Sequence, residues 1–345
     1  MTTTAPVSST TRTNRSAVLR GERDVVVEDR PVPEPGPGEV LVEVGAVGIC
    51  GSDVHYYEHG RIGPFVVEAP MVIGHEAAGT VVAVGEGVDP ARVGELVALE
   101  PGVPCRHCEQ CLAGRYNLCP DVVFFATPPV DGAITTLVTL DADFAFPAPE
   151  GLDAEQAAMA EPVSVGVWAC RKAGVAAGDR VLVTGAGPIG LLAGQVARAF
   201  GATQVTITDV SDFRLGVAAD LGLDAHRADQ PLTNEYDVLL ECSGAPVAVK
   251  TGLAALARAG RAVLVGMGPD EVPINVPLVQ SRELTVTGTF RYARTYPLAL
   301  QLIDSGAVDV RRLITHHFGL EETEAALTAS RREPQSIKSI VLPQR

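Results

Sequence analysis

The hydrophobic positions of the chain form short runs in its first half and a regular succession of strand-like and helix-like segments in its second half. The early runs are Asp24–Glu28, Val40–Val47, Gly79–Val84, Leu96–Leu99 and Ala133–Leu140. Clusters of glycine and proline, such as residues 31–38, separate these runs, and such clusters are typical of turns between strands. The first half is therefore predicted to be rich in β-strands.

The pattern changes after about Pro162, where a helical segment, Val163–Ala173, leads into alternating strands and helices. The expected strands are Arg180–Thr184, Gln204–Asp209, Asp237–Cys242, Ala262–Val265 and Leu284–Thr289. The expected helices are Pro188–Phe200, Phe213–Leu221, a segment near Val247–Leu256, and Pro277–Arg282. Ser211 is predicted to cap the helix at Phe213, because its hydroxyl can accept from a first-turn amide. This alternation indicates an α/β fold with a Rossmann-type, doubly wound parallel sheet.

The last part of the chain is less regular. Two helices are expected there, at Tyr296–Asp304 and Glu321–Ser330, followed by an apolar run at Ile337–Leu342. The pattern alone does not assign these three elements to either half of the chain.

Length and charge limit the classes of protein that fit the chain. Its 345 residues exceed what one hydrophobic core usually organises, which predicts two domains. The formal net charge of −15 would repel a phosphate backbone, so nucleic acid is not an expected partner. No apolar run reaches the length of about 18 residues that a membrane span needs. Residues 1–16, mostly Thr, Ser, Pro and Arg, predict a disordered tail without a secretory signal, and we expect a cytoplasmic protein.

A glycine-rich turn follows the first strand of the second half. The segment Val181–Gly190 reads strand, G-x-G-x-x-G, then helix, which is the order that cradles a pyrophosphate at a helix N-terminus. A second strand ends in Asp209, 24 residues after Gly185, where a carboxylate can accept from the ribose hydroxyls and repel a 2′-phosphate. NAD is therefore favoured over NADP, although Arg214 nearby keeps NADP open. The candidate cofactor residues are Gly185, Gly187, Pro188, Ile189, Gly190, Asp209 and Arg214.

Four of the seven cysteines lie within 15 residues. Their spacing is C-x2-C-x2-C-x7-C, and the four residues are Cys105, Cys108, Cys111 and Cys119. Four thiolates can close a tetrahedron around Zn²⁺, and such a filled shell is typical of a structural site. An iron–sulfur cluster and four unrelated thiols are the alternatives, and zinc suits one short lobe within a β-rich domain best.

A second group of metal-binding residue types is dispersed along the first half. Cys50 begins a segment that also contains Ser52 and His55, and His75 is followed directly by Glu76. A Cys, a His and a carboxylate leave a fourth position of Zn²⁺ open, which is the arrangement of catalytic zinc. Spacing alone also permits an ordinary buried histidine. Glu161 lies where the first domain is expected to end, and a domain junction lines a cleft.

These residues stand in segments that resemble the zinc-dependent medium-chain alcohol dehydrogenases, and within that family the polyol (sorbitol and xylitol) dehydrogenases. The resemblance extends from about Val18 to Leu342. The segments that carry it most specifically are Val47–Tyr57, Gly60–Gly63, Gly74–Gly79, Gly114–Leu118, Ala126–Pro129, Glu161–Gly166 and Phe290–Tyr292.

The resemblance implies roles for individual residues. Cys50, His75 and Glu76 would bind the catalytic zinc, and Glu161 would bind it directly or through a water molecule. The residues that would line the substrate pocket are Tyr56, Phe125, Arg291 and Tyr292. Ser52 and His55 would carry the alcohol proton outward by way of the cofactor ribose. The expected reaction is hydride transfer from a secondary alcohol of a polyol to NAD, with zinc as the Lewis acid and a ketose as the product.

The resemblance also implies an organisation. A GroES-like catalytic domain would comprise residues 17–162 and 290–345, with the zinc lobe at 105–119, and a Rossmann domain would comprise residues 163–289. A homo-oligomer, a tetramer or a dimer, is expected. Many polyol dehydrogenases lack some lobe cysteines, whereas this chain has all four, so two zinc ions per chain are predicted. Between Leu221 and Tyr236 the chain is shorter than the family pattern, with room for at most a fragment of the usual helix.

The sequence leaves two other functions open. One is a different secondary-alcohol dehydrogenase of the same fold, acting on threonine, butanediol or a sugar acid. The other is a non-catalytic dinucleotide-binding protein that uses zinc only for folding, against which the joint presence of Cys50, His75, Glu76 and Glu161 argues.

Overall fold

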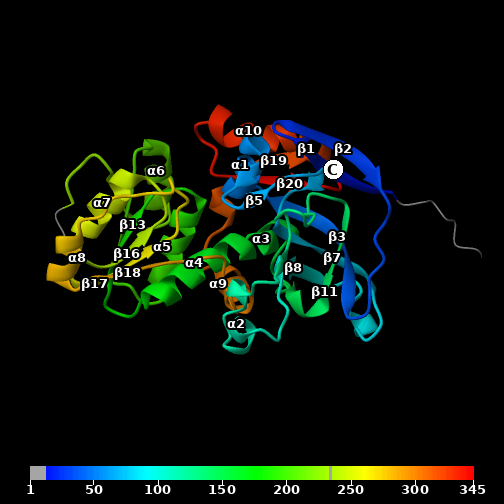
Figure 1. Ribbon diagram of the computed structural model, residues 1–345, viewed down its shortest axis with the longest axis horizontal. Coiled ribbons are helices and arrows are strands. Elements are labelled where there is room, and N and C mark those ends of the chain that lie inside the picture. Colours follow the sequence, from blue (N-terminus) through cyan, green and yellow to red (C-terminus); the bar gives the residue numbers. More distant parts are fainter. Residues whose placement is uncertain (1–12, 233–234) are drawn as a thin grey trace, which may run out of the picture.

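The computed structural model describes residues 13–232 and 235–345, whose two large sheets, of six and seven strands, have helices packed on and between them (Figure 1). One sheet is built from the middle of the chain, and the other combines the first half with the C-terminal strands. Within these described ranges, no helix is long and apolar enough to cross a membrane.

The sheet from the middle of the chain has six parallel strands in the order β15-β14-β13-β16-β17-β18. Its strands are β13 (Arg180–Thr184), β14 (Gln204–Asp209), β15 (Asp224–Arg227), β16 (Tyr236–Glu241), β17 (Leu256–Leu264) and β18 (Thr285–Gly288). The order reverses between β13 and β16, and ligands of doubly wound sheets bind at the carboxyl ends of the strands at such a point. The predicted Rossmann sheet is thus confirmed.

Helices precede the first strand of this sheet and alternate with most of the others, as the pattern predicted. They are α4 (Ala160–Ala173), α5 (Pro188–Ala199), α6 (Asp212–Asp220), α7 (Pro246–Ala254) and α8 (Val276–Arg282). The side chain of Ser211 accepts from the amide of Arg214 at the start of α6, which confirms the predicted N-cap. After β15, residues 228–232 form no helix, in agreement with the expected shortening, and residues 233–234 lie outside the described part.

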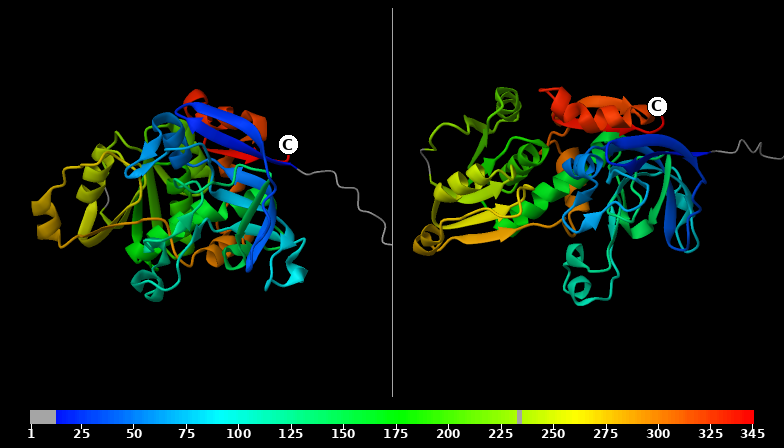
Figure 2. Two further views of the ribbon diagram at one scale, coloured as in Figure 1. Left: turned by 45° about the vertical axis from the view of Figure 1, so that its right-hand side comes forward. Right: turned by 45° about the horizontal axis from the view of Figure 1, so that its top comes forward.

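The second sheet joins distant parts of the sequence. Its path is β12-β8-β7-β3-β20-β19, with β11 also paired to β3. Its strands are β3 (Glu39–Gly48), β7 (Glu76–Val84), β8 (Leu96–Leu99), β11 (Leu137–Asp141), β12 (Ala145–Pro147), β19 (Ile314–Gly319) and β20 (Lys338–Leu342). Because β20 pairs antiparallel with β3, the C-terminal apolar run belongs with the first half of the chain. Figure 2 shows these C-terminal elements lying against the β-rich body.

Smaller elements surround this sheet. A ribbon of β1 (Asn14–Gly21) and β2 (Asp24–Arg30) pairs with β6 (Met71–Val72). The short strands are β4 (Arg61–Ile62), β5 (Phe65–Val66), β9 (Gly102–Val103) and β10 (Val123–Phe124), and the remaining helices are α1 (Gly51–His59), α2 (Glu109–Leu112), α3 (Ala154–Ala158), α9 (Tyr296–Asp304) and α10 (Thr323–Arg332).

Two expectations need correction, and several elements, strand β15 among them, were not predicted. The tail was expected to reach Ser16, but Asn14–Ser16 belong to β1, where Asn14 and Ser16 are buried and hydrogen-bonded to residues 135–137; residues 1–12 lie outside the described part. The run Ala133–Leu140 becomes a strand only from Leu137. Helix α1 and strand β19 were not predicted, because neither carries a clear apolar periodicity.

Candidate active site and metal centres

Cys50 lies at the junction of β3 and α1, where Asp53 shapes the turn. Cys50 is the N-cap residue of α1, and its amide donates to Asp53 Oδ2 at 2.9 Å. The other oxygen, Oδ1, accepts from the amide of Gly74 at 3.0 Å. Asp53 is fully buried, so this single carboxylate joins the Cys50 turn to the loop that precedes His75.

His75 and Glu76 follow at the start of β7. His75 Nδ1 lies 3.6 Å from Asp53 Oδ1, an orientation in which the imidazole directs this nitrogen at a carboxylate and leaves Nε2 for a metal. Burial by itself would lower the pKa of His75, but Asp53 and Cys50 together raise this pKa well above its usual value. The ligand atoms of Cys50, His75 and Glu76 all lie within 4.8 Å of one another. We call these three residues the mixed-ligand group.

Lys338 brings a positive charge to this group from the opposite end of the chain. Its Nζ lies 2.6 and 2.8 Å from the two oxygens of Glu76 and donates to the carbonyl of Ile49 at 3.0 Å. Lys338 and Glu76 are 3% and 1% exposed. A carboxylate has about four lone-pair sites, so Glu76 retains acceptor capacity beyond the lysine.

The donor set of the mixed-ligand group fits zinc. Sulfur, imidazole nitrogen and carboxylate oxygen are the three ligand types of protein-bound Zn²⁺, and three protein ligands leave one position open. His75 and Glu76 are buried, whereas Cys50 is partly exposed, so the group is reached from the side of Cys50.

Glu161 lies in the first turn of α4, and its carboxylate is not one of the converging ligand atoms of the mixed-ligand group. Its Oε1 accepts from the Tyr292 hydroxyl at 2.7 Å, and both side chains are buried. Burial raises the pKa of Glu161 to about 7, while His75 opposes this rise and Glu76 adds to it. The carboxyl therefore neighbours the mixed-ligand group and is held toward Tyr292.

Three of the four expected pocket residues gather around Glu161. Burial lowers the pKa of Arg291, and the neighbouring Tyr292, Tyr56 and Glu161 counteract this shift. The Arg291 guanidinium lies 3.8 Å from the Phe124 ring centroid and donates to Thr127 Oγ1 at 3.3 Å. Within the described ranges, Arg291 has no carboxylate at ion-pair distance, so it is not a surface ion pair.

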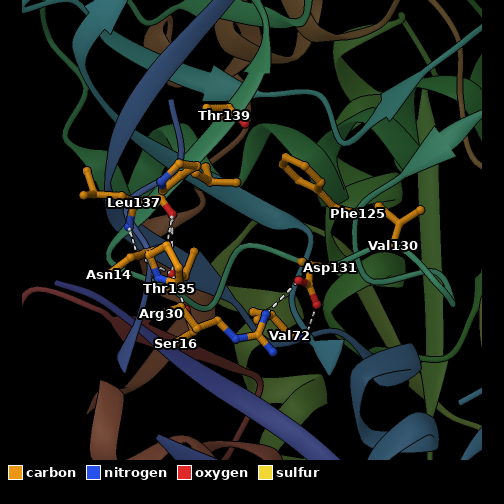
Figure 3. A pocket seen from close by; sticks show the side chains of 14 residues that line it. Asn14, Ser16, Arg30, Val72, Phe125, Val130, Asp131, Thr135, Leu137 and Thr139 are labelled. Carbon is orange, nitrogen blue, oxygen red and sulfur yellow. Dashed lines mark hydrogen bonds and ion pairs between the residues drawn. The ribbon is translucent and has the colours of Figure 1, made fainter. Parts of the chain in front are cut away.

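The fourth expected pocket residue, Phe125, lines a second cavity. It lines a cavity beneath the β1–β2 ribbon together with Asn14, Thr135 and Asp131 (Figure 3). None of the other expected pocket residues, and no residue of the mixed-ligand group, lines this cavity. Phe125 belongs to the same hydrophobic cluster as Tyr56, but it does not line the small cavity that Arg291 and Tyr292 share.

The two residues expected to move a proton lie on α1. Ser52 is partly exposed in the first turn, and His55 is exposed one turn later, with its ring centroid 5.6 Å from that of His59. The order Ser52, His55 thus leads from the mixed-ligand group toward solvent along one helix.

The glycine-rich turn has the geometry of a phosphate cradle. Gly185 has φ +91°, and a Cβ on Gly190 would lie 1.8 Å from the Gly185 carbonyl oxygen. Gly187 is the N-cap of α5, with Pro188 and Ile189 in the first turn, and a Cβ there would meet nothing within 4 Å. Open space therefore faces the free amides of the helix N-terminus, which is where a pyrophosphate binds.

Asp209 lies beside this turn, at the end of β14. Its Oδ2 accepts from the amide of Ala186 at 2.7 Å and its Oδ1 from the amide of Ser211 at 2.8 Å. These bonds hold the carboxylate at the edge of the cradle. The neighbouring strand brings Arg227 into register with Asp209, and Arg227 is itself paired with two other aspartates.

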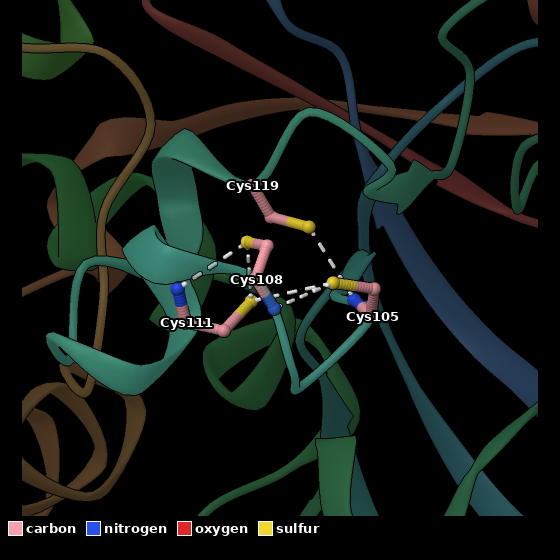
Figure 4. A group of neighbouring side chains, drawn as sticks. All are labelled: Cys105, Cys108, Cys111 and Cys119. Carbon is pink, nitrogen blue, oxygen red and sulfur yellow. Dashed lines mark hydrogen bonds between the residues drawn. The ribbon is translucent and has the colours of Figure 1, made fainter.

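The four clustered cysteines form a separate lobe, residues 105–119, which projects from the body (Figure 2). Their sulfurs converge within 4.8 Å of one another, with Cys108 Sγ 3.4 Å from Cys111 Sγ, and all four are free thiols (Figure 4). Backbone amides, chiefly that of His107, lower the pKa of Cys105 to about 6, whereas burial raises the pKa of Cys111. A dication would allow all four to ionise, so the set fits a tetrahedral Zn²⁺.

Sequence reasoning assigned no role to two residues that contact the mixed-ligand group, Asp53, which stands in the same polar segment as Cys50, and Lys338. A signal existed for each of them. Asp53 stands three residues after Cys50, which is the spacing of a capping box. Lys338 interrupts an apolar run, and a lysine there is buried only when it is paired.

The fold, the mixed-ligand group and the cysteine lobe together define a class of protein. The alcohol dehydrogenase GroES-like domain family matches residues 36–150, and the zinc-binding dehydrogenase family matches residues 188–305. The chain belongs to the zinc-dependent medium-chain alcohol dehydrogenase family.

Within this family, the chain is similar to sorbitol dehydrogenases. It is 43% identical to that of Bacillus subtilis over 344 residues, covering 96% of this chain and 98% of the relative. It is 45% identical to that of Mus musculus over 334 residues, covering 92% and 93%. An alcohol dehydrogenase structure from Escherichia coli, complexed with NADH, superimposes with a TM-score of 0.89 at 29% identity, covering 96% of this chain and 99% of that one.

Proposed function

We propose that this protein oxidises a secondary alcohol of a polyol, such as xylitol or sorbitol, to a ketose, with NAD as the hydride acceptor. One observation carries the proposal: the ligand atoms of the mixed-ligand group converge next to Glu161. The guanidinium of Arg291 interacts electrostatically with the same glutamate. The position of these residues in a chain that is 43–45% identical to sorbitol dehydrogenases supports the substrate class.

The chain's own residues divide the work of substrate binding. Cys50, His75 and Glu76 would hold a zinc ion, which when bound would supply the Lewis acidity that makes a substrate hydroxyl easier to deprotonate. Arg291 keeps free N–H donors for the other hydroxyls of a polyol, since among the described residues it donates only to Thr127. Tyr56 and Tyr292 add hydroxyl groups to the same wall, and Phe125 is the least supported of the four pocket residues.

Proton movement is assigned to two sets of residues. Glu161, whose pKa is raised to about 7 by burial, holds or anchors the group that occupies the open ligand position, directly or through water. Ser52 and His55 pass the alcohol proton along α1 toward solvent. The residues of the glycine-rich turn would hold the cofactor, whose nicotinamide ring would supply the hydride-accepting chemistry.

NAD rather than NADP follows from the charges at the cradle. Asp209 is held at the cradle edge by two backbone amides, and its negative charge disfavours a 2′-phosphate. Arg227 is occupied by Asp212 and Asp229, so it is not free to bind such a phosphate. Arg214 is the remaining nearby cation, and it follows Asp212 in the first turn of α6.

The proposal also covers the domain boundaries, the second zinc site and the oligomeric state. A GroES-like domain comprises residues 14–162 and 290–345, and a Rossmann domain comprises residues 163–289, which is supported by the two separate large sheets and by the place of Asn14–Ser16 in β1. The cysteine lobe holds a second, structural zinc. A homo-oligomer is supported by the edge of β18, which has no second strand partner in the described part of the chain, and by exposed hydrophobic side chains such as Ile274 and Val276.

The test is an assay of NAD reduction with xylitol, sorbitol, L-threonine and butanediol as separate substrates. We expect turnover with the polyols, and NADP should support much slower turnover than NAD. Turnover of threonine or butanediol alone would refute the polyol assignment. One zinc per chain, unaffected by Cys50→Ala, together with no turnover of any alcohol, would favour a non-catalytic dinucleotide-binding protein.

A further inference from the structure

Two hydrogen bonds join the cysteine lobe to the segment that carries Arg291 and Tyr292. Asn117 Nδ2 donates to the carbonyl of Phe290 at 2.8 Å. The Tyr116 hydroxyl accepts from the amide of Arg294 at 2.7 Å. Asn117 is 5% exposed, so its bond is protected from competing water. Both lobe residues lie in the 3₁₀ turn Tyr116–Leu118, immediately before the lobe's last cysteine, Cys119.

The segment that these bonds hold, residues 290–294, has an unusual backbone. Arg291 has φ +52° and Arg294 has φ +55°, a region that non-glycine residues seldom adopt. The segment belongs to neither β18 nor α9. Such a conformation persists only where the surrounding structure imposes it. A further hydrogen bond to this backbone comes from Arg171, which donates to the carbonyl of Arg294 at 2.8 Å.

The same segment places two pocket side chains. Arg291 stacks on Phe124, and the Tyr292 hydroxyl donates to Glu161. A small cavity is lined jointly by Tyr116 and Asn117 from the lobe and by Arg291 and Tyr292 from the segment. Movement of the turn Tyr116–Leu118 would therefore displace the segment at both of its ends, Phe290 and Arg294.

We propose that Tyr116 and Asn117 are positioning residues for the substrate pocket, and that closure of the four-cysteine site sets the geometry of Arg291 and Tyr292 through them. This inference rests on the proposed function, because it assigns those two side chains to polyol binding. The metal of the lobe then governs polyol affinity as well as local stability. A purely structural lobe would affect stability alone.

The first experiment compares Asn117→Ala with Gln110→Ala. Gln110 lies in the same lobe and loses one hydrogen bond, that from Arg115, without touching residues 290–294. One hydrogen bond corresponds to roughly a 2- to 12-fold effect. We expect Asn117→Ala to raise KM for xylitol or sorbitol by about that factor, with kcat and NAD affinity little changed. Its KM for 2-propanol, which has no further hydroxyl to contact, should change less. Gln110→Ala should leave all these constants near wild type.

The second experiment removes the lobe metal and reads the segment directly. Cys108→Ser should reduce the zinc content by one ion per chain and raise the polyol KM to a similar degree. The double variant Cys108→Ser/Asn117→Ala should raise the polyol KM by less than the product of the two single effects. Both substitutions act through the same contact between the lobe and residues 290–294, so their effects should not be independent. Hydrogen–deuterium exchange should be faster at residues 290–295 in both single variants, and unchanged in the strands of the parallel sheet.

The outcomes separate the two proposals. If the wild-type protein turns over no polyol, the proposed function fails, and the exchange measurement still decides the coupling. Unchanged exchange at residues 290–295 in Asn117→Ala and Cys108→Ser would overturn the coupling. So would equal KM values for Asn117→Ala and Gln110→Ala with a polyol that the wild type does oxidise.

Discussion

The cysteine lobe and the mixed-ligand group offer metal ligands in opposite ways. The lobe takes four like ligands from 15 consecutive residues (Figure 4) and projects from the body (Figure 2). The mixed-ligand group takes three unlike ligands from β7 and from the start of α1, and the charges around them come from Asp53 and Lys338. A local motif can close a metal shell by itself, whereas an open shell needs the tertiary structure to hold each donor. The first is therefore suited to stability and the second to catalysis.

The sharpest test of this contrast is Cys50→Ser. Loss of the thiolate should lower kcat/KM for the polyol by roughly 1,000-fold or more, because Lewis-acid assistance is worth several kcal/mol. The melting temperature and NAD affinity should stay close to wild type, since Cys50 is partly exposed. Metal analysis should find one zinc per chain, that of the lobe. Full activity in the variant would show that the catalytic assignment is wrong.

Lys338→Met tests whether the mixed-ligand group depends on a distant charge. Removing one partner of a buried ion pair costs about 3–5 kcal/mol, so the free energy of unfolding should fall by that amount in metal-free protein. Zinc should recover part of the loss, because it neutralises Glu76. Urea denaturation with and without a chelator measures both effects. Lys250→Met, an exposed position in α7, is the control and should change little. Equal stability of the two variants would contradict the role of Lys338.

Cys108→Ser should show the reverse of Cys50→Ser. Constraining a loop of about 15 residues contributes about 3 kcal/mol, and we expect a loss of stability of that order in the lobe. The kcat value should remain within a few-fold of wild type. Thermal unfolding followed together with zinc content is the measurement. A kcat lowered as strongly as in Cys50→Ser would abolish the distinction between the two sites.

Asp209→Ala has the smallest expected effect, because it alters the choice of cofactor and leaves both metal sites intact. The ratio of kcat/KM with NAD to kcat/KM with NADP should fall roughly 10-fold, as a charged hydrogen-bond acceptor is lost. Both zinc ions should remain bound. An unchanged ratio would remove Asp209 from the ribose site.

The predictability of the two sites differs for a physical reason. The cysteine spacing and the strand–glycine–helix order are local patterns, and the structure places Cys105–Cys119 and Gly185–Gly190 as those patterns indicate. The mixed-ligand residues were assigned through family resemblance, since a lone cysteine, histidine or glutamate more often serves packing or solubility than metal binding. Helix α1, which positions Cys50, Ser52 and Tyr56, escaped prediction because polar residues occupy most of its nine positions.

The amino-acid order alone was enough for the dinucleotide turn and the four-cysteine cluster, because each is a local motif, and for the parallel sheet, because strands and helices alternate along the chain even though its central strands β13 and β16 pair across 57 positions. Tertiary structure alone decided that Lys338 meets Glu76 across 262 positions, and that Asn117 and Phe290 join across 173. Such partners share no periodicity or spacing. They meet because β20 pairs with β3 and because residues 290–294 return to the lobe, and chain folding, not local preference, brings those backbones together.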